Sequence, residues 1–433
     1  MADLIRRALI YMGNDVKFVR NYTDVGHLAS DADEGEDKME KGAKREGKTP
    51  QEIAQKYIDI FENDVNALNI LPPNVSPRAT EYVQQMIEMV QELLDKDFAY
   101  ATPTAIYFDV TKFPEYTKLS GQRLDQMLEG AGQGEVSDAE NKRHPADFAV
   151  WFFKTGAHKN AVQTWPSPFS SPEVENGEGF PGWHIECSAM TKAELGDTLD
   201  IHMGGVEHIP IHHPNEIAQS EAANGVKFVN YWLHNEHLTV DGSKMAKSEG
   251  TSYSLADVIE EGYEPLVLRY FFLAAHYRSK QNFTWEALTA ALTAYSRLLA
   301  KVAEYFQATN KPLQAAPDAD FKAKFIAALE EDFNVPQALA VAWDLTKTDL
   351  AADVKLATLL DFDQVLGLKL ESAMENPRAE VEIPEAALRL LTEREQARAN
   401  KEWTKADELR AQLRSEFNLE IDDSSAGQIV KLV

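Results

Sequence analysis

The stretch from Gly182 to Ser248 constrains this 433-residue chain more than any other part of its sequence. It begins with a segment that contains Cys187, the only cysteine of the chain. A pair of histidines and a carboxylate follow between His212 and Glu216, and two lysines then lie in a loop of Gly, Ser and Met residues. Each piece alone is a weak or moderate signal. Together, and in this order, they indicate one functional centre.

The first two pieces carry the chemistry of a metal site. A thiolate, an imidazole and a carboxylate are all good zinc ligands. A helix that starts at Pro214, a residue suited to the first helical position, would place His212 and Glu216 about one turn apart. The alternative is a buried structural Cys187 beside histidines that only form hydrogen bonds, and this spacing is not among the stronger zinc patterns.

The third piece is the string Lys244-Met245-Ala246-Lys247-Ser248. Two lysines three residues apart, set among small residues, can bring two ammonium groups to a polyphosphate as point charges. A solvated surface turn is the alternative, and the string by itself favours that alternative.

Composition indicates a large protein with substantial cores. The chain is 44% hydrophobic and 26% charged, which predicts two to four domains. A single cysteine excludes an internal disulfide framework and suits a reducing compartment, so we expect a cytoplasmic protein. Charges interrupt the N-terminal stretch Met1 to Met12, and the longest apolar run, Tyr270 to Ala275, is too short to span a bilayer.

The formal net charge of −27 argues against a nucleic-acid partner, because phosphate contacts need Lys and Arg. It does not exclude RNA, since recognition of loops and shape needs only local basic patches. The C-terminal helices expected over Pro384 to Phe417 carry the basic residues Arg389, Arg394, Arg398, Lys401, Lys405, Arg410 and Arg414. The carboxylates interleaved with them favour a salt-bridged helix surface.

The rest of the chain alternates between helical and strand patterns. Helices are expected over Ala2 to Met12, Thr49 to Leu68, Pro77 to Lys96, Trp285 to Glu304, Asp320 to Leu329 and Pro336 to Lys347. The apolar stripes of the second and third of these helices are expected in the core. A strand is expected over Val16 to Val19, and short strands from about Ala99 to Pro181. Trp151 and Trp165 in that segment could stack on RNA bases but are more typical of a core. The acidic stretch Asp31 to Asp37 lacks calcium-loop spacing and is interpreted as a solvated loop.

These residues resemble the class I aminoacyl-tRNA synthetases and, among them, the cysteinyl-tRNA synthetases. Lys244 to Ser248 resembles the Lys-Met-Ser-Lys-Ser loop of that class, with Ala246 in the middle. Pro181 to Met190 is similar to the segment that holds a zinc cysteine of the family, and His212 and Glu216 fall on two other zinc positions. The resemblance covers nearly the whole chain and includes Asn21 to Val25, Glu331 to Pro336 and Ala406 to Arg410.

The resemblance implies a fold and a domain plan. We expect an α/β, Rossmann-like catalytic domain over residues 1–250, with an insertion at about 99–181. A linker and helical bundle would follow over 251–371, and a small C-terminal tRNA-binding module over 384–433.

The resemblance also implies a reaction, in which cysteine and ATP form cysteinyl-adenylate and the cysteinyl group passes to tRNA(Cys). The implied partners are cysteine, ATP with Mg as substrate, and tRNA(Cys), with no membrane and a monomeric enzyme. One zinc ion per subunit would be held by Cys187, His212 and Glu216. Lys244 and Lys247 would be catalytic and bind ATP together with Ser248, and Trp183 would bind the substrate. Zinc would favour a substrate thiolate over a serine hydroxyl, which is a harder and more basic ligand.

Two features depart from the family pattern. The His-Ile-Gly-His motif and the strand before it are absent, and Gly26-His27-Leu28 is interpreted as ordinary loop rather than a substitute. No second cysteine is present to complete the zinc ligands. We therefore expect weak adenylate formation by this chain. The alternatives are a cysteine:amino-sugar ligase of the related class, disfavoured by the C-terminal helices, and a non-catalytic tRNA- or zinc-binding remnant, favoured by the absent motif.

Overall fold

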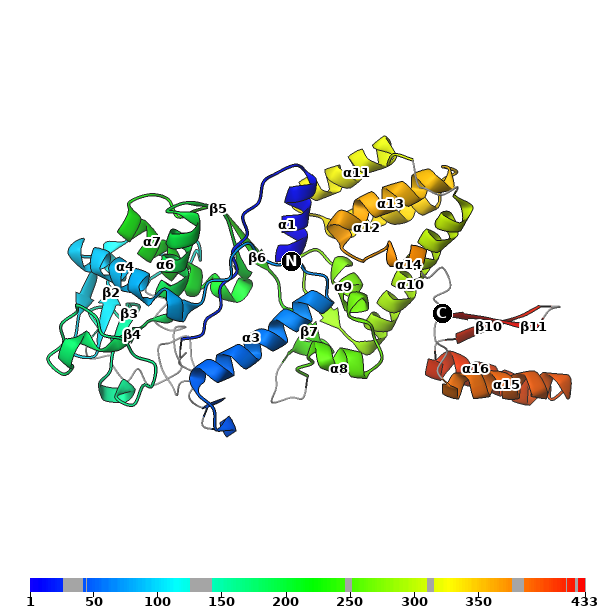
Figure 1. Ribbon diagram of the computed structural model, residues 1–433, viewed down its shortest axis with the longest axis horizontal. Coiled ribbons are helices and arrows are strands. Elements are labelled where there is room, and N and C mark those ends of the chain that lie inside the picture. Colours follow the sequence, from blue (N-terminus) through cyan, green and yellow to red (C-terminus); the bar gives the residue numbers. More distant parts are fainter. Residues whose placement is uncertain are drawn as a thin grey trace. The chain divides into compact units, whose positions relative to one another are not determined.

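The computed structural model describes residues 1–25, 42–43, 45–124, 142–245, 251–309, 315–375, 385–417, 419–424 and 427–432. The chain divides into two compact units, and Figure 1 labels helices and strands of both. The first contains Met1–His237 and Tyr277–Lys280, and the second contains Leu238–His276 and Gln281–Val433. No helix in the described ranges is long and apolar enough to cross a membrane.

The first unit begins with helix α1 (Ala2–Tyr11), close to the expected bounds. A buried ion pair one turn apart, from Arg7 Nε to Asp3 Oδ2 at 2.9 Å, stabilises it. The strand expected over 16–19 is wrong: in the described chain this region forms only an isolated parallel bridge, Val19 with Val75. The partner segment contains Pro72, Pro73 and Pro77, which have no N–H to donate, so a regular ladder cannot extend along it.

Helices α3 (Pro50–Ala67) and α4 (Val83–Asp95) follow. α3 begins with a capping box in which the side chains of Thr49 and Glu52 each accept a hydrogen bond from the other residue's backbone N–H. The apolar stripe of α4 lies in the core, as expected, although the helix starts later than Pro77, after a 3₁₀ turn, η1 (Ala79–Glu81). The stripe of α3 is not wholly buried: its exposed residues are Tyr57, Ile60 and Phe61, at 41–51%. Only its N-terminal turns, at Ile53 and Ala54, reach the interior.

An antiparallel sheet packs on α4 and on α6 (Trp183–Leu195). Its strands, in spatial order, are β1 (Ala99–Ala101), β2 (Ala105–Phe108), β3 (Phe148–Phe153) and β4 (Gly179–Pro181). Trp151 on β3 is fully buried against Phe169, so it is a core residue and not an RNA-stacking surface. This sheet and the helices around the site share one hydrophobic core.

The first unit also contains a βαβ motif, on which the candidate functional site is built. Strand β5 (Leu199–Gly205) leads through η5 (Val206–His208) into α7 (His212–Asn224), and β6 (Val229–Asn235) returns parallel to β5. α7 begins at His212, two residues before the Pro214 expected to start it, and ends where Gly225 adopts a left-handed conformation. Because β5 and β6 are parallel, their C-terminal ends meet at one edge, beside the N-terminus of α7.

The second unit combines a small sheet with helices. Its strands are β7 (Leu238–Val240), β8 (Ser243–Lys244) and β9 (Gln281–Phe283). Its helices are α8 (Leu255–Glu260), α9 (Pro265–Leu273), α10 (Trp285–Ala308), α11 (Ala319–Glu330), α12 (Val335–Thr346), α13 (Ala352–Leu366) and α14 (Ser372–Glu375). The expected helices over 285–304, 320–329 and 336–347 are confirmed by α10, α11 and α12.

The C-terminal segment has its own small core. Helices α15 (Glu385–Ala399) and α16 (Trp403–Phe417) are followed by a hairpin, β10 (Leu419–Ser424) and β11 (Gly427–Leu432), which sequence reasoning missed. Ala387, Leu391, Leu413, Leu419 and Ile421 form the core.

Candidate metal centre

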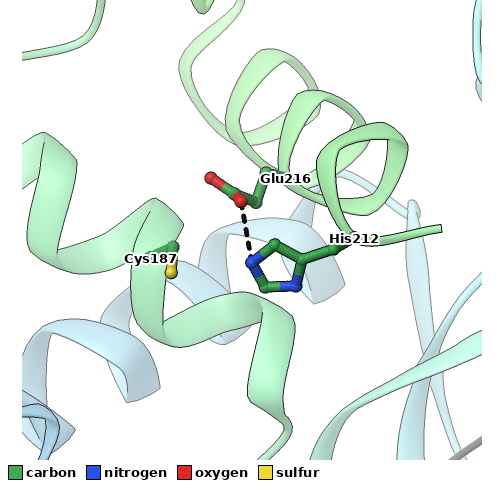
Figure 2. A group of neighbouring side chains, drawn as sticks. All are labelled: Cys187, His212 and Glu216. Atoms are coloured by element: carbon green, nitrogen blue, oxygen red, sulfur yellow. Dashed lines mark ion pairs between the residues drawn. The ribbon is translucent and has the colours of Figure 1, made fainter. Parts of the chain in front are cut away.

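Two neighbouring helices bring Cys187, His212 and Glu216 together. Cys187 lies in the second turn of α6, while His212 and Glu216 lie one turn apart on the same face of α7. Each side chain offers one ligand atom, and the three atoms lie within 4.8 Å of one another. Figure 2 shows the three side chains converging from these helices.

The local sequence fixes the two helices against their surroundings. α6 begins directly after Gly182, where a Cβ atom would lie 2.1 Å from the Ala149 carbonyl oxygen, so only glycine allows this approach to β3. Gln219 on α7 joins the helices, because its Nε2 donates to the His184 carbonyl at 3.0 Å and to Ser188 Oγ at 3.1 Å. These contacts hold Cys187 opposite Glu216.

The Glu216 carboxylate is fully buried between two imidazoles. Its Oε1 lies 2.9 Å from His212 Nε2, and its Oε2 lies 3.3 Å from His202 Nε2. Burial alone would raise the pKa of Glu216, but the charges of His202 and His212 outweigh it and hold that pKa well below its usual range. Imidazoles and a carboxylate held this close together offer ligand atoms to a shared cation, because both groups are zinc ligands.

Cys187 is partly buried, and Asn21 Nδ2 donates weakly to its Sγ at 3.9 Å. Burial raises the pKa of the Cys187 thiol well above its usual value, and the charges of Glu216 and Glu186 raise it further, while the Asn21 contact lowers it. A coordinated cation reverses this effect, since a thiol bound to a metal loses its proton. A soft thiolate, an imidazole and a carboxylate within reach of one another are a donor set that fits zinc.

Further histidines surround the three residues. His184 Nδ1 lies 2.8 Å from His212 Nδ1, and His213 Nδ1 lies 2.8 Å from His234 Nε2. Burial lowers the pKa of His213 to about 2 and also lowers the pKa of His234, which keeps both rings neutral near pH 7. Trp183 covers His212, with ring centroids 4.3 Å apart.

Sequence reasoning missed His184, His202 and His234. The signal that could have found two of them is their position: His202 lies on β5 and His234 near the end of β6, strands whose C-terminal ends meet beside α7. Among the predicted ATP-binding residues, Lys244 is exposed on β8 in the second unit. Lys247 and Ser248 lie outside the described residues, as do Gly26-His27-Leu28 and the acidic stretch 31–37.

Comparison with known families and proteins gives consistent matches. A model of the family described as tRNA synthetases class I (C) catalytic domain matches residues 1–293, and one described as Cysteinyl-tRNA ligase anticodon binding domain matches residues 380–415. The chain is 44% identical over 427 residues to a cysteine--tRNA ligase 1 of Burkholderia lata, covering 98% of this chain and 86% of that protein. It is 40% identical over 445 residues to a cysteine--tRNA ligase of Thermus thermophilus, covering 98% and 88%.

A solved structure is similar in fold. The methionyl-tRNA synthetase of Mycobacterium tuberculosis, bound by methionyl-adenylate, matches with a TM-score of 0.56 over 88% of this chain and 92% of that chain. At 15% identity, the match concerns the fold alone.

Proposed function

The chain belongs to the cysteinyl-tRNA synthetases of class I, and we propose that it activates cysteine with ATP and transfers the cysteinyl group to tRNA(Cys) in the cytoplasm. The observation that carries the proposal is the convergence of Cys187, His212 and Glu216. These residues would hold one zinc ion. The names of the relatives and the C-terminal match favour tRNA over an amino-sugar acceptor.

Each residue around the proposed zinc position has a distinct task. His184 holds the Nδ1 side of His212, which leaves His212 Nε2 to face Glu216. Glu216, held ionised, supplies negative charge from a fully buried position. Trp183 covers the His212 ring and would form an apolar wall for a small substrate. Zinc in this position would bind the substrate thiol as a thiolate, which gives a reason to prefer cysteine over serine.

The lysine loop would act on ATP. Lys247, assisted by Lys244, would bind the phosphates and stabilise the charge on the departing pyrophosphate, with Ser248 as a further contact. The exposure of Lys244 supports this role, because an exposed ammonium group can approach a polyphosphate as a point charge.

The C-terminal helices would contact the anticodon end of the tRNA. The exposed basic residues of this segment are Arg389, Lys401, Lys405, Arg410 and Arg414. Arg394, which the sequence groups with them, is buried at 2% and belongs to the interior of the segment. These exposed side chains would supply the positive charge that contacts to RNA phosphates need.

The proposal is tested by measuring cysteine-dependent ATP–pyrophosphate exchange and cysteinylation of tRNA(Cys), with zinc content determined on the same preparation. We expect Glu216→Gln, which keeps the side-chain size and removes the charge, to lower both zinc content and discrimination against serine. Transfer of cysteine to an amino-sugar and not to tRNA would refute the assignment. Normal zinc content and unchanged discrimination in Glu216→Gln would refute the ligand set.

A further inference from the structure

Strand β9 contacts the chain on both sides of the lysine loop, Lys244 to Ser248. Before the loop, β7 pairs with β8 in a hairpin, and β7 also pairs with β9 in parallel. After the loop, the ring of Tyr253 packs against Phe283 of β9. All of these elements belong to the second unit. One short strand therefore supports both flanks of the loop.

The side chain of Asn282, on β9, holds the turn between β7 and β8. Its Oδ1 accepts a hydrogen bond of 2.7 Å from the backbone N–H of Gly242, and the hydroxyl of Thr239 lies 3.0 Å from the same oxygen. The N–H of Asp241 donates to the Phe283 carbonyl at 3.1 Å. Asp241 and Gly242 have φ angles of 49° and 77°, as a two-residue hairpin turn requires. Both residues of the turn are thus bonded to β9.

Lys244 follows this turn on β8. Its backbone pairs with Thr239 across the hairpin, and its side chain is exposed. The turn sets the register of a hairpin, and the register decides where each side chain of the strand points. The hydrogen bond between Gly242 and Asn282 therefore affects where the ammonium group of Lys244 lies.

Separate contacts hold the chain after the loop. The centroid of the Tyr253 ring lies 5.7 Å from that of Phe283 and 5.1 Å from that of Trp285. The next residue, Ser254, begins α8 with a capping box that includes Asp257. A substitution at Asn282 leaves these contacts in place, so its effect is confined to the flank that carries Lys244.

We propose that Asn282 is a positioning residue for ATP activation. By holding the Asp241–Gly242 turn, its Oδ1 places the ammonium group of Lys244 where it meets the phosphates, and Asn282 itself does not touch the nucleotide. The proposal rests on the proposed function, which assigns the lysine loop to ATP. Because Asn282 is exposed and contributes ordinary hydrogen bonds, removing its side chain should lower kcat/KM for ATP roughly 3–10-fold.

The test is a double-mutant cycle in the full chain, measured as kcat/KM for ATP in cysteine-dependent ATP–pyrophosphate exchange. Asn282→Ala should lower kcat/KM by that amount in the wild-type background. It should have no effect in the Lys244→Ala background, because the group that it positions is then absent. A role in stability alone would give the same fold-change in both backgrounds. Asn230→Ala, which changes an exposed asparagine on β6, is the matched control and should equal the wild type.

The same cycle is repeated for Mg·ATP affinity by equilibrium dialysis, which needs no turnover and decides the matter where exchange is below detection. Equal fold-changes in the two backgrounds would overturn the role of Asn282. Wild-type values in Asn282→Ala beside impaired values in Lys244→Ala would overturn it as well. Wild-type values in Lys244→Ala would instead refute the proposed function of the loop, and this inference with it.

Discussion

His184 and His212 face each other through their Nδ1 atoms, 2.8 Å apart, although 28 positions separate them in the chain. One ring comes from the first turn of α6 and the other from the first turn of α7. The contact occupies Nδ1 of His212 and turns its Nε2 toward Glu216. His184 therefore positions a proposed ligand without being one.

We expect His184→Gln to weaken zinc binding by about 10–100-fold, because orienting partners of metal-bound imidazoles contribute effects of this size. Competition with a chromophoric chelator measures the change. His237→Gln, which alters an exposed histidine, should leave the affinity at the wild-type value. Equal affinities in the two variants would show that His184 does not orient His212.

The burial of His213 predicts acid sensitivity in the metal-stripped protein. Its folded pKa is about 2 and its usual value is 6.5, so the unfolded chain takes up the proton first as the pH falls. The free energy of unfolding therefore keeps its full value above pH 6.5. Below pH 6.5 it falls by up to about 1.4 kcal/mol for each pH unit. Denaturant unfolding between pH 7.5 and 5 should show a shallower loss for His213→Asn than for the wild-type chain. The same slope in both would contradict this origin.

Lys247→Ala should lower the rate of ATP–pyrophosphate exchange by orders of magnitude, because it removes charge that stabilises the departing pyrophosphate. Lys244→Ala should have a smaller effect in the same direction. Zinc content should stay constant in both variants. Lys347→Ala removes an exposed lysine that pairs with Asp344 and serves as the control. An exchange rate near that of the control would refute the role of Lys247.

Substitutions of the C-terminal arginines should have different effects, depending on whether the arginine is exposed or buried. Arg410→Ala should weaken tRNA binding and reduce the slope of log K against log salt by about 1, as expected for one phosphate contact. Its thermal midpoint should not change, because Arg410 is exposed. Arg394→Ala should instead lower the thermal midpoint, since its guanidinium lies inside the segment. If Arg394→Ala weakened tRNA binding and Arg410→Ala lowered the thermal midpoint, the assignment of the exposed arginines to tRNA contact would be wrong.

Local signals made much of this structure predictable from sequence. The Thr49 and Glu52 capping box and the apolar period of α4 depend on residues three or four positions apart, so they can be read without the fold. The same holds for His212 and Glu216, whose spacing places them on one helical face. Local pattern failed at residues 16–19, because pairing there depends on a proline-containing partner more than 50 positions away.

The tertiary structure decided which side chains surround Cys187, His212 and Glu216. The sequence by itself determined the helix pair His212 and Glu216 and offered Cys187 as a third candidate ligand from its residue type, and the resemblance favoured the same three residues. His202 on β5 contacts Glu216 on α7, and His234 on β6 contacts His213 on α7, and no sequence spacing encodes these contacts. The close approach of α6 to α7 sets His184 against His212. Helix periodicity fixes neighbours within one element, whereas contacts between elements follow from packing of the whole core.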